Sequence, residues 1–235
     1  MVQTNNKVKF DDYVDTYEKE IQSSIDFIGQ DHDFFVSVKA DIIKDLAKRH
    51  FDEPHKLKVL DIGCGIGLID HYLKNYFENI FGIDLEEGVI EKAQKYNPSV
   101  NYIVYDGKTL PFEDNSTDVV FTVNVMHHIP PELQEHCLAE IYRVTQKGGL
   151  VIVMEHNPLN PLTRKAVSNC EFDRDAILIH KNEMKNLFSS CGLKDIRSSY
   201  ILFFPFSKSF FRKIEKLIEW VPLGAQYYVY GWKLD

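Results

Sequence analysis

A glycine loop between a short apolar run and a helix-like stretch constrains this chain most strongly. The apolar run covers residues 58–62, and glycines follow at Gly63, Gly65 and Gly67. Glycine has no Cβ, so the backbone there can pass close to a ligand. In open α/β sheets, ligands bind beyond the carboxyl ends of the strands. The loop therefore predicts a ligand site at one edge of a parallel sheet.

Strand-like and helix-like segments alternate along the chain after this loop. Further apolar runs, which we expect to be strands, lie at 80–84, 100–104, 118–123, 150–154, 198–204 and 226–232. Helical patterns at 68–77, 86–95, from Pro130 onward and at 181–191 lie between them. Strands that alternate with helices form right-handed βαβ units and a parallel sheet covered on both faces. The pattern predicts an α/β sandwich of three layers.

Three segments are expected to lie outside the sheet and the helices that cover it. We interpret 1–235 as a single domain in which residues 1–53 form an N-terminal helical cap. Apolar residues recur every fourth position in 34–46, which stacks them on one helix face. The segments 156–180 and 205–224 do not fit the bare sheet and are interpreted as insertions on the substrate side.

Composition narrows the range of partners. The formal net charge of −8 leaves no basic footprint for a nucleic acid, so none is expected as a partner. The N-terminus has no apolar signal-peptide core, and no stretch reaches the roughly 18 apolar residues of a membrane span. The four cysteines are far apart, which is typical of reduced thiols in a cytoplasmic protein.

The loop departs from the fingerprint of dinucleotide-binding folds. That fingerprint places a third glycine where this chain has Leu68. Asp61 lies two residues before the first glycine, and its carboxylate would repel a pyrophosphate. A carboxylate there can instead orient backbone or hold the ammonium group of an amino-acid moiety. A nicotinamide oxidoreductase is therefore a remote alternative.

An acidic residue followed by the spacing GxGxG resembles the first motif of class I S-adenosylmethionine-dependent methyltransferases. The resemblance covers residues 57–155 and the two terminal strands. It implies a Rossmann-like, seven-stranded, mostly parallel sheet with an antiparallel last strand. It also implies that Asp84 binds the ribose hydroxyls, Asp106 the adenine amino group and Asn124 the methionine end. The implied cofactor contacts are Tyr17, Asp61, Gly63, Cys64, Gly65, Asp84, Leu85, Asp106, Gly107 and Asn124.

Tyr17, with Tyr13 as its alternative, enters that set because many relatives close an N-terminal tyrosine over the cofactor. The candidate catalytic residues follow the fourth and fifth predicted strands. They are His127, His128, Glu155 and His156. Imidazole and carboxylate groups can take a proton from an acceptor near neutral pH. No third ligand with suitable spacing accompanies the histidine pair, so we expect no metal site.

The acceptor is expected to be a small molecule methylated on oxygen, or less readily on nitrogen or carbon. Residues 124–127 read Asn-Val-Met-His, which lacks the Pro-Pro-aromatic string of enzymes that methylate exocyclic amines or glutamine. It also lacks the Pro-Cys nucleophile of cytosine C5 enzymes. Apolar and basic residues alternate at helical spacing in 205–224, a pattern that favours an apolar or lipid-like acceptor, peripheral membrane contact or dimerisation. Either a monomer or a homodimer fits.

Two other classes remain open at this stage. The chain could methylate RNA or protein, although RNA binding would call for a more basic surface. It could also be a cofactor-binding scaffold without catalysis. The joint presence of Gly63, Gly65, Asp84 and Asp106 argues against a scaffold, because an inactive pocket has no reason to keep all four.

Overall fold

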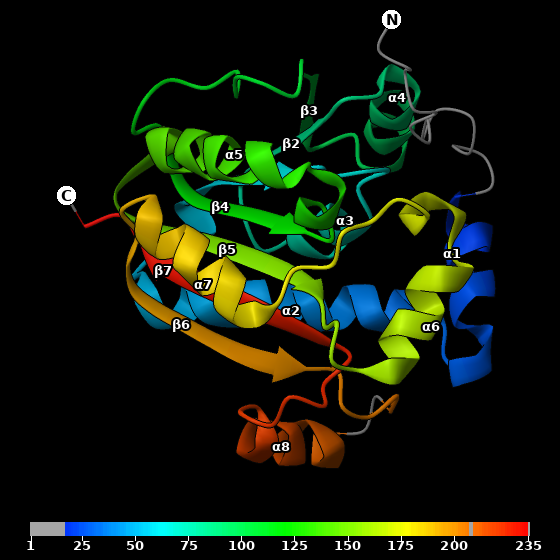
Figure 1. The fold of residues 1–235 in the computed structure, drawn as a ribbon. Helices are drawn as coiled ribbons and strands as arrows, with labels where there is room; N and C mark the ends of the chain where they lie inside the picture. The colour runs from blue at the N-terminus through cyan, green and yellow to red at the C-terminus, as the bar shows by residue number, and fades with distance from the viewer. Residues whose placement is uncertain (1–16, 207–208, 235) are drawn as a thin grey trace, which may run out of the picture.

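The computed structural model describes residues 17–206 and 209–234, which form a seven-stranded sheet with helices on both faces (Figure 1). The strand order is β3-β2-β1-β4-β5-β7-β6. The strands are β1 (Lys58–Ile62), β2 (Asn79–Asp84), β3 (Asn101–Val104), β4 (Thr117–Val123), β5 (Thr145–His156), β6 (Lys194–Ile201) and β7 (Gln226–Trp232). Only β7 runs antiparallel to its neighbours, so the predicted fold class is confirmed.

The helices connect these strands and extend the chain at its N-terminal side. The α-helices are α1 (Tyr17–Ile25), α2 (His32–His50), α3 (Leu68–Leu73), α4 (Glu87–Tyr96), α5 (Pro131–Val144), α6 (Pro161–Asn169), α7 (Lys181–Ser190) and α8 (Ser209–Ile218). Short 3-10 helices are η2 (Asp26–Ile28), η3 (Pro54–Lys56), η4 (Met126–His128) and η5 (Glu171–Asp173). None of the helices in 17–206 or 209–234 is long and apolar enough to cross a membrane.

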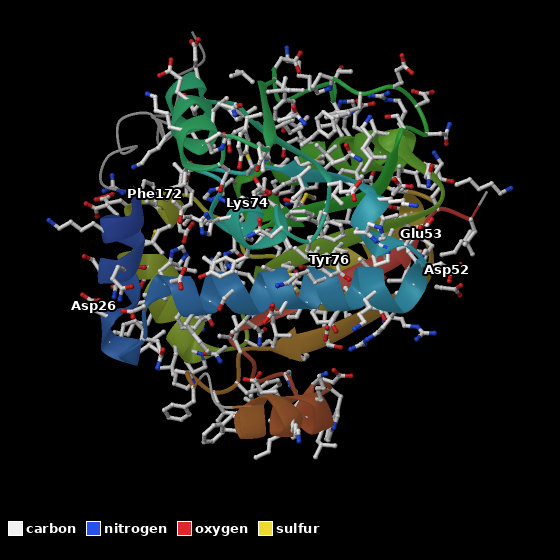
Figure 2. The ribbon with its side chains drawn as sticks, turned by 180° about the vertical axis from the view of Figure 1, so that it is seen from behind. Asp26, Asp52, Glu53, Lys74, Tyr76 and Phe172 are labelled. Carbon is white, nitrogen blue, oxygen red and sulfur yellow. The ribbon has the colours of Figure 1, made fainter. Side chains whose placement is uncertain are left out.

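Each face of the sheet has its own apolar core. Neighbouring residues of a strand point to opposite faces. Val59 of β1 therefore packs with α2 and α3, and Leu60 packs with α5 and α7. Both side chains are fully buried. In Figure 1, α5 and α7 cover the near face, and the reverse view shows α2 lying across the other (Figure 2).

The described part of the N-terminal region contains the helices α1 and α2. Gly29 separates α2 from the short η2 turn and adopts a φ of 71°, which is a left-handed conformation that glycine tolerates best. The buried face of α2 includes Ile43 and Leu46. This face fixes α2 on the sheet, while α1 lies beyond its N-terminal end, beside α6 (Figure 1).

The two expected insertions form short helices. The segment 156–180 contains α6, which Asn160 caps by accepting hydrogen bonds from the amides of Leu162 and Thr163. The segment 205–224 contains α8 and leaves Leu217, Trp220 and Leu223 more than half exposed. The helix predicted in 205–224 is confirmed, whereas its contact with a membrane or a second chain stays a prediction.

Candidate active site

A cavity of about 1160 Å³ opens where the parallel strands end. Gly63 follows β1, Asp84 ends β2, Asn124 follows β4 and His156 ends β5, and all four line the cavity. The cavity therefore lies at the edge of the sheet where the sequence predicts a ligand site. Of the predicted cofactor contacts, the cavity is lined by Asp61, Gly63, Cys64, Gly65, Asp84, Leu85, Gly107 and Asn124.

The glycine loop needs glycine for conformation and for space. Gly63 and Gly67 adopt φ values of 71° and 77°. A Cβ at Gly63 would collide with the side chain of Val125, and one at Gly67 would collide with the Tyr102 hydroxyl. The bare backbone of the loop therefore packs closely against its neighbours while Gly65 remains open to the cavity.

Asp84 holds the loop from the neighbouring strand. Its Oδ2 accepts a hydrogen bond from the Gly65 amide at 2.9 Å, and its Oδ1 accepts one from the Leu85 amide at 2.7 Å. Asp84 is half-buried and lines the cavity. The same carboxylate is thus able to organise the glycine loop and to face a ligand.

Asp61 lies beneath the loop and beside a second buried acid. Burial, and after it the nearby charge of Asp70, raises the pKa of Asp61 well above its usual value. Burial also raises the pKa of Asp70 to about 7, although the Tyr102 hydroxyl donates a hydrogen bond to this carboxyl at 2.9 Å. Burial and the mutual repulsion of the two acids therefore favour a protonated carboxyl in this pair, which an isolated aspartate would not keep.

Lys39 is a cavity residue that the sequence analysis misses. It is 4% exposed on α2 and lines the cavity. Burial lowers its pKa to about 8, and the charges of Glu155 and Asp61 oppose that shift. A buried ammonium group therefore faces the same space as the Asp61 carboxyl. Lys39 lies among apolar residues of α2, so no sequence pattern near it indicates that it lines a cavity.

Asp106 is placed differently from the other predicted contacts. Its Oδ1 accepts hydrogen bonds from the amides of Lys108 and Thr109, which lowers the pKa of the carboxyl. Asp106 does not line the cavity, whereas Gly107 does. The carboxylate thus caps its own turn and leaves the neighbouring backbone to face the cavity. Tyr13 lies outside the described residues, as does the side chain of Tyr17.

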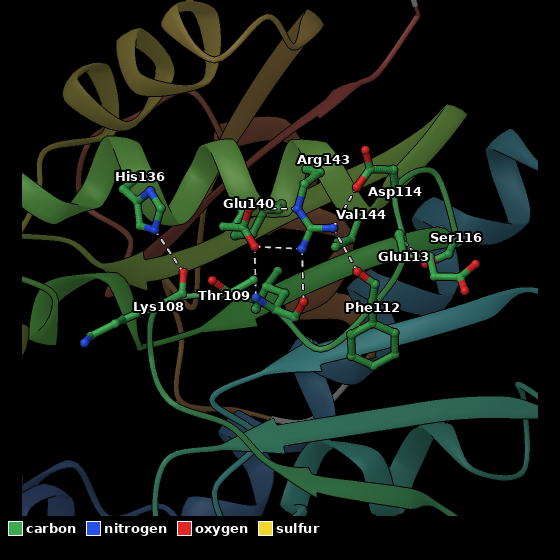
Figure 3. A network of polar contacts seen from close by, with 12 residues as sticks. Lys108, Thr109, Phe112, Glu113, Asp114, Ser116, His136, Glu140, Arg143 and Val144 are labelled. Carbon is green, nitrogen blue, oxygen red and sulfur yellow. Dashed lines mark hydrogen bonds and ion pairs between the residues drawn. The ribbon is translucent and has the colours of Figure 1, made fainter.

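The segment after Gly107 is fixed to α5 by a polar network (Figure 3). The Arg143 guanidinium donates hydrogen bonds to the carbonyls of Leu110 and Phe112 at 3.0 and 2.8 Å. Glu140 binds the same guanidinium and accepts a hydrogen bond from the Leu110 amide. The network thus fixes the segment whose Gly107, Lys108 and Leu110 line the cavity.

The candidate catalytic residues meet at a carboxylate from the 156–180 insertion. His127 is buried, and its Nδ1 lies 2.5 Å from Glu155 Oε2. The Nε2 atoms of His127, His128 and His156 lie 3.3, 3.4 and 4.0 Å from the nearest carboxylate oxygen of Asp173. His128, His156 and Asp173 line the cavity, whereas His127 and Glu155 lie behind its wall.

Charge within this cluster is divided unequally. Burial acts to lower the pKa of His127, but the charges and hydrogen bonds of Glu155 and Asp173 outweigh it and raise that pKa to about 10. Burial, followed by the charge of His127, lowers the pKa values of His128 and His156 to about 4. Two neutral imidazoles therefore face the cavity in front of one buried imidazolium.

Glu155 also fixes the turn that carries the histidine pair. It accepts hydrogen bonds from the amides of Val125 and Met126 at 3.1 and 2.8 Å, in addition to its contact with His127. Glu155 is thus a positioning residue. Asp173 was visible in the sequence only as one charged residue of an insertion, because no spacing rule connects it to a histidine 46 residues earlier.

Comparisons with known proteins agree with the fold and with the position of the glycine loop. A family described as a methyltransferase domain matches residues 60–153, the span from the glycine loop to the fifth strand. The 2-methyl-6-phytyl-1,4-hydroquinone methyltransferase of Synechocystis is 33% identical over 108 residues, which cover 44% of this chain and 33% of that protein. The 24-methylenesterol C-methyltransferase 2 of Arabidopsis thaliana is 27% identical over 169 residues, which cover 66% and 46%. The chain thus spans less than half the length of these two relatives.

The fold is also found among solved structures. A methyltransferase from Thermotoga maritima, described as S-adenosylmethionine-dependent and as a possible histamine N-methyltransferase, superposes with a TM-score of 0.66 at 22% identity. The superposition covers 95% of this chain and 98% of that one. Sheet order, glycine loop and matched domain agree: residues 60–153 match a methyltransferase domain, and the fold around them is that of the S-adenosylmethionine-dependent methyltransferase superposed above.

Proposed function

We propose that this protein transfers a methyl group from S-adenosylmethionine to a small, apolar acceptor, on oxygen. The observation that carries the proposal is one cavity that contains both the glycine loop and the histidine cluster. Its volume of about 1160 Å³ exceeds the roughly 300–1,000 Å³ of a typical single-ligand pocket, so it has room for a cofactor and an acceptor. The cofactor supplies an activated methyl group on a positively charged sulfur when bound.

The cofactor end of the cavity offers charges that match the ends of the ligand. Asp61 and Lys39 present a carboxyl and an ammonium group, which complement the ammonium and carboxylate of the methionine moiety. Asp84 is available to the ribose hydroxyls, and the Gly107 backbone to the adenine ring. The Asp106 carboxylate would reach the adenine amino group only by leaving its turn, so we assign that contact to the backbone.

The acceptor end has an apolar lining. It comes from α1, η2, α6, η5 and the chain after β6, and includes Ile21, Ile25, Ile28, Leu162, Val167, Phe172, Leu202 and Phe203. Apolar walls with few polar groups select an apolar ligand. The two curated relatives described above are named for a phytyl hydroquinone and a sterol, which supports this choice. The net charge of −8 supports a small molecule over RNA.

The histidine cluster gives that end its chemistry. Proximity of acceptor and methyl group supplies most of the rate in such a transfer. A hydroxyl acceptor must also lose its proton, and His128, His156 and Asp173 are among the polar groups that face the acceptor space next to the apolar lining. We therefore assign proton removal to this cluster, with Glu155 and His127 holding it in place.

Asp84→Ala tests the cofactor assignment. We expect S-adenosylmethionine to bind more than about tenfold more weakly, because a hydrogen bond to a charged group contributes about 1.5–3 kcal/mol. Isothermal titration calorimetry measures the change. Asp84→Asn should lose less, since its amide oxygen can still accept from Gly65. Asp52→Ala, at the far end of α2 (Figure 2), is the control and should bind normally. Unchanged binding by Asp84→Ala, or binding of NAD alone, would remove the assignment.

The affinity for S-adenosylmethionine should fall as the pH is lowered. The ammonium of the cofactor favours ionised Asp61, so binding expels the proton held by the pair of Asp61 and Asp70. The dissociation constant should rise as the pH is lowered and the pair takes up this proton, by up to about tenfold per pH unit. Calorimetry between pH 5.5 and 8 measures it. Asp70→Asn removes the neighbouring acid and should move the decline to lower pH; an unmoved profile would contradict this account.

A further inference from the structure

We propose that His127, His128 and Asp173 form a binding site for one divalent transition-metal ion at the acceptor end of the cavity, beside His156. The sequence gives no third ligand near the histidine pair, and for that reason predicts no metal. The fold supplies one, because η5 brings Asp173 against η4. Donor atoms of His127, His128 and Asp173 all lie within 4.8 Å of one another, close enough for one ion.

The distances within the cluster fit metal ligands better than direct ion pairs. Charge-assisted N–H···O contacts measure about 2.7–2.9 Å. The nearest Asp173 oxygen lies 3.3 Å from His127 Nε2 and 3.4 Å from His128 Nε2. Two ligands bound to zinc at about 2.1 Å in a tetrahedron lie about 3.4 Å apart. The two distances from Asp173 to the imidazoles therefore equal those between ligands of one tetrahedral ion, and all three donors lie within 4.8 Å of one another.

The second nitrogen of His127 has the partner that metal-binding histidines usually have. A ligating imidazole commonly donates its other N–H to a carboxylate, which fixes the tautomer and the ring. Here Glu155 Oε2 lies 2.5 Å from His127 Nδ1, and the pair is fully buried. Glu155 therefore directs His127 Nε2 toward Asp173. An ion would take the place of the proton on that nitrogen.

Gln226 provides an independent observation at His156. Its amide nitrogen is placed 3.3 Å from His156 Nδ1, and its amide oxygen is buried without a hydrogen-bond partner in the described part of the chain. A Nδ1–H of His156 would satisfy this oxygen only if the amide oxygen and nitrogen of Gln226, and of Asn124 beside it, were exchanged. In that orientation His156 Nε2 would carry a lone pair on the side of Asp173, next to the proposed ion.

The donor set selects the kind of ion. Two imidazoles and one carboxylate suit zinc, cobalt or another late first-row ion and leave a fourth position open, whereas magnesium and calcium prefer shells made of oxygen. A divalent ion would also balance the two buried negative charges of Glu155 and Asp173. His128, His156 and Asp173 open to the cavity, so an acceptor oxygen could complete the shell and ionise more easily. This last consequence, unlike the site itself, depends on the proposed function.

The test uses the full chain after removal of metal with a chelator. Titration with Co²⁺ should give the visible absorption of a tetrahedral nitrogen–oxygen site, saturating at one ion per chain. Zn²⁺ should bind the same site in calorimetry and displace Co²⁺, while Mg²⁺ should not. Asp173→Asn and His128→Asn should each weaken binding of Co²⁺ and Zn²⁺ by more than about tenfold. Glu171→Gln is the matched control, because Glu171 lies in the same 3-10 helix but pairs with Arg174 at the surface.

Two outcomes would overturn the metal site. One is the absence of stoichiometric Co²⁺ and Zn²⁺ binding by the unaltered chain, which would leave the cluster as a buried ionic network. The other is an unchanged affinity of His128→Asn for Co²⁺ and Zn²⁺. The His128 side chain is 24% exposed, so the fold should tolerate its replacement. Circular dichroism establishes folding of each variant. Binding of S-adenosylmethionine, measured on the same metal-free protein, separates failure of this site from failure of the proposed function.

Discussion

Asp61→Asn is expected to weaken S-adenosylmethionine binding while it stabilises the ligand-free protein. Loss of a charged hydrogen-bond partner for the cofactor ammonium should raise the dissociation constant roughly 10- to 150-fold, equivalent to about 1.5–3 kcal/mol. The ligand-free protein meanwhile holds two acids side by side in a buried site, and the pKa of Asp70 is raised to about 7 as a result of burial. Removing one acid should increase the free energy of unfolding at pH 8 by about 1–3 kcal/mol.

The opposite signs of the two effects make this a sharp experiment. Calorimetry gives the affinity and urea denaturation gives the stability of the same preparation. Asp70→Asn is the matched control: it should stabilise the protein similarly but change affinity at pH 8 by less than about threefold, because Asp61 alone lines the cavity. Asp61→Asn that binds normally would show that the ammonium lies elsewhere. A less stable Asp61→Asn would show that the carboxyl pair is well accommodated without ligand.

The sequence predicts the cofactor side of the site because that side is built from local patterns. Asp61 lies near the end of one strand, the glycines at 63–67 follow that strand, and Asp84 ends the next; both strands can be recognised from their own residues. Parallel strands bring their carboxyl ends to one edge, so these residues must meet once the fold class is known. The eight predicted contacts that line the cavity all lie at or near the carboxyl ends of parallel strands.

Residues that depend on long-range packing could not be predicted. Lys39 lies in an apolar helix face, and only the docking of α2 on the sheet turns it toward Asp61. Asp173 reaches the histidines because η5 folds back over η4, which no sequence spacing indicates. For Asp106 the local pattern misleads in the opposite direction. Its place after a strand suggests a ligand contact, but its carboxylate accepts hydrogen bonds from the amides of Lys108 and Thr109 instead.

The boundaries of β5 illustrate a similar limit. The predicted strand covers 150–154, because Gly148 and Gly149 look like the end of the preceding helix. In the structure, α5 ends at Val144 and β5 begins at Thr145. Gly148 then donates a hydrogen bond to the carbonyl of Lys233, so the tail of β7 extends the strand on its far side. The strand begins at Thr145 because that residue pairs with Thr117 of β4, and Lys233 pairs with the two glycines that follow.

Glu155→Ala is expected to cost about 3–5 kcal/mol of unfolding free energy, the range for removing one member of a buried charged pair. Glu155 is fully buried and its carboxylate binds the amides of Val125 and Met126 as well as His127. Without it, two buried amides and an imidazole lose their acceptor at once. Urea denaturation of the variant and of Glu53→Ala, a change at an exposed acid, measures the difference.

Glu155→Gln separates hydrogen bonding from charge in this effect. The glutamine oxygen can still accept from the two amides, so Glu155→Gln should regain about 1–2 kcal/mol of the loss. It cannot balance the charge of the cluster, so its affinity for Co²⁺ should stay reduced. If Glu155→Ala loses less than about 1 kcal/mol, then Glu155 does not position the turn, and the histidines must be held by Asp173 alone. A stable Glu155→Gln with full metal affinity would instead show that the hydrogen bonds of residue 155 orient His127 and that its charge does not.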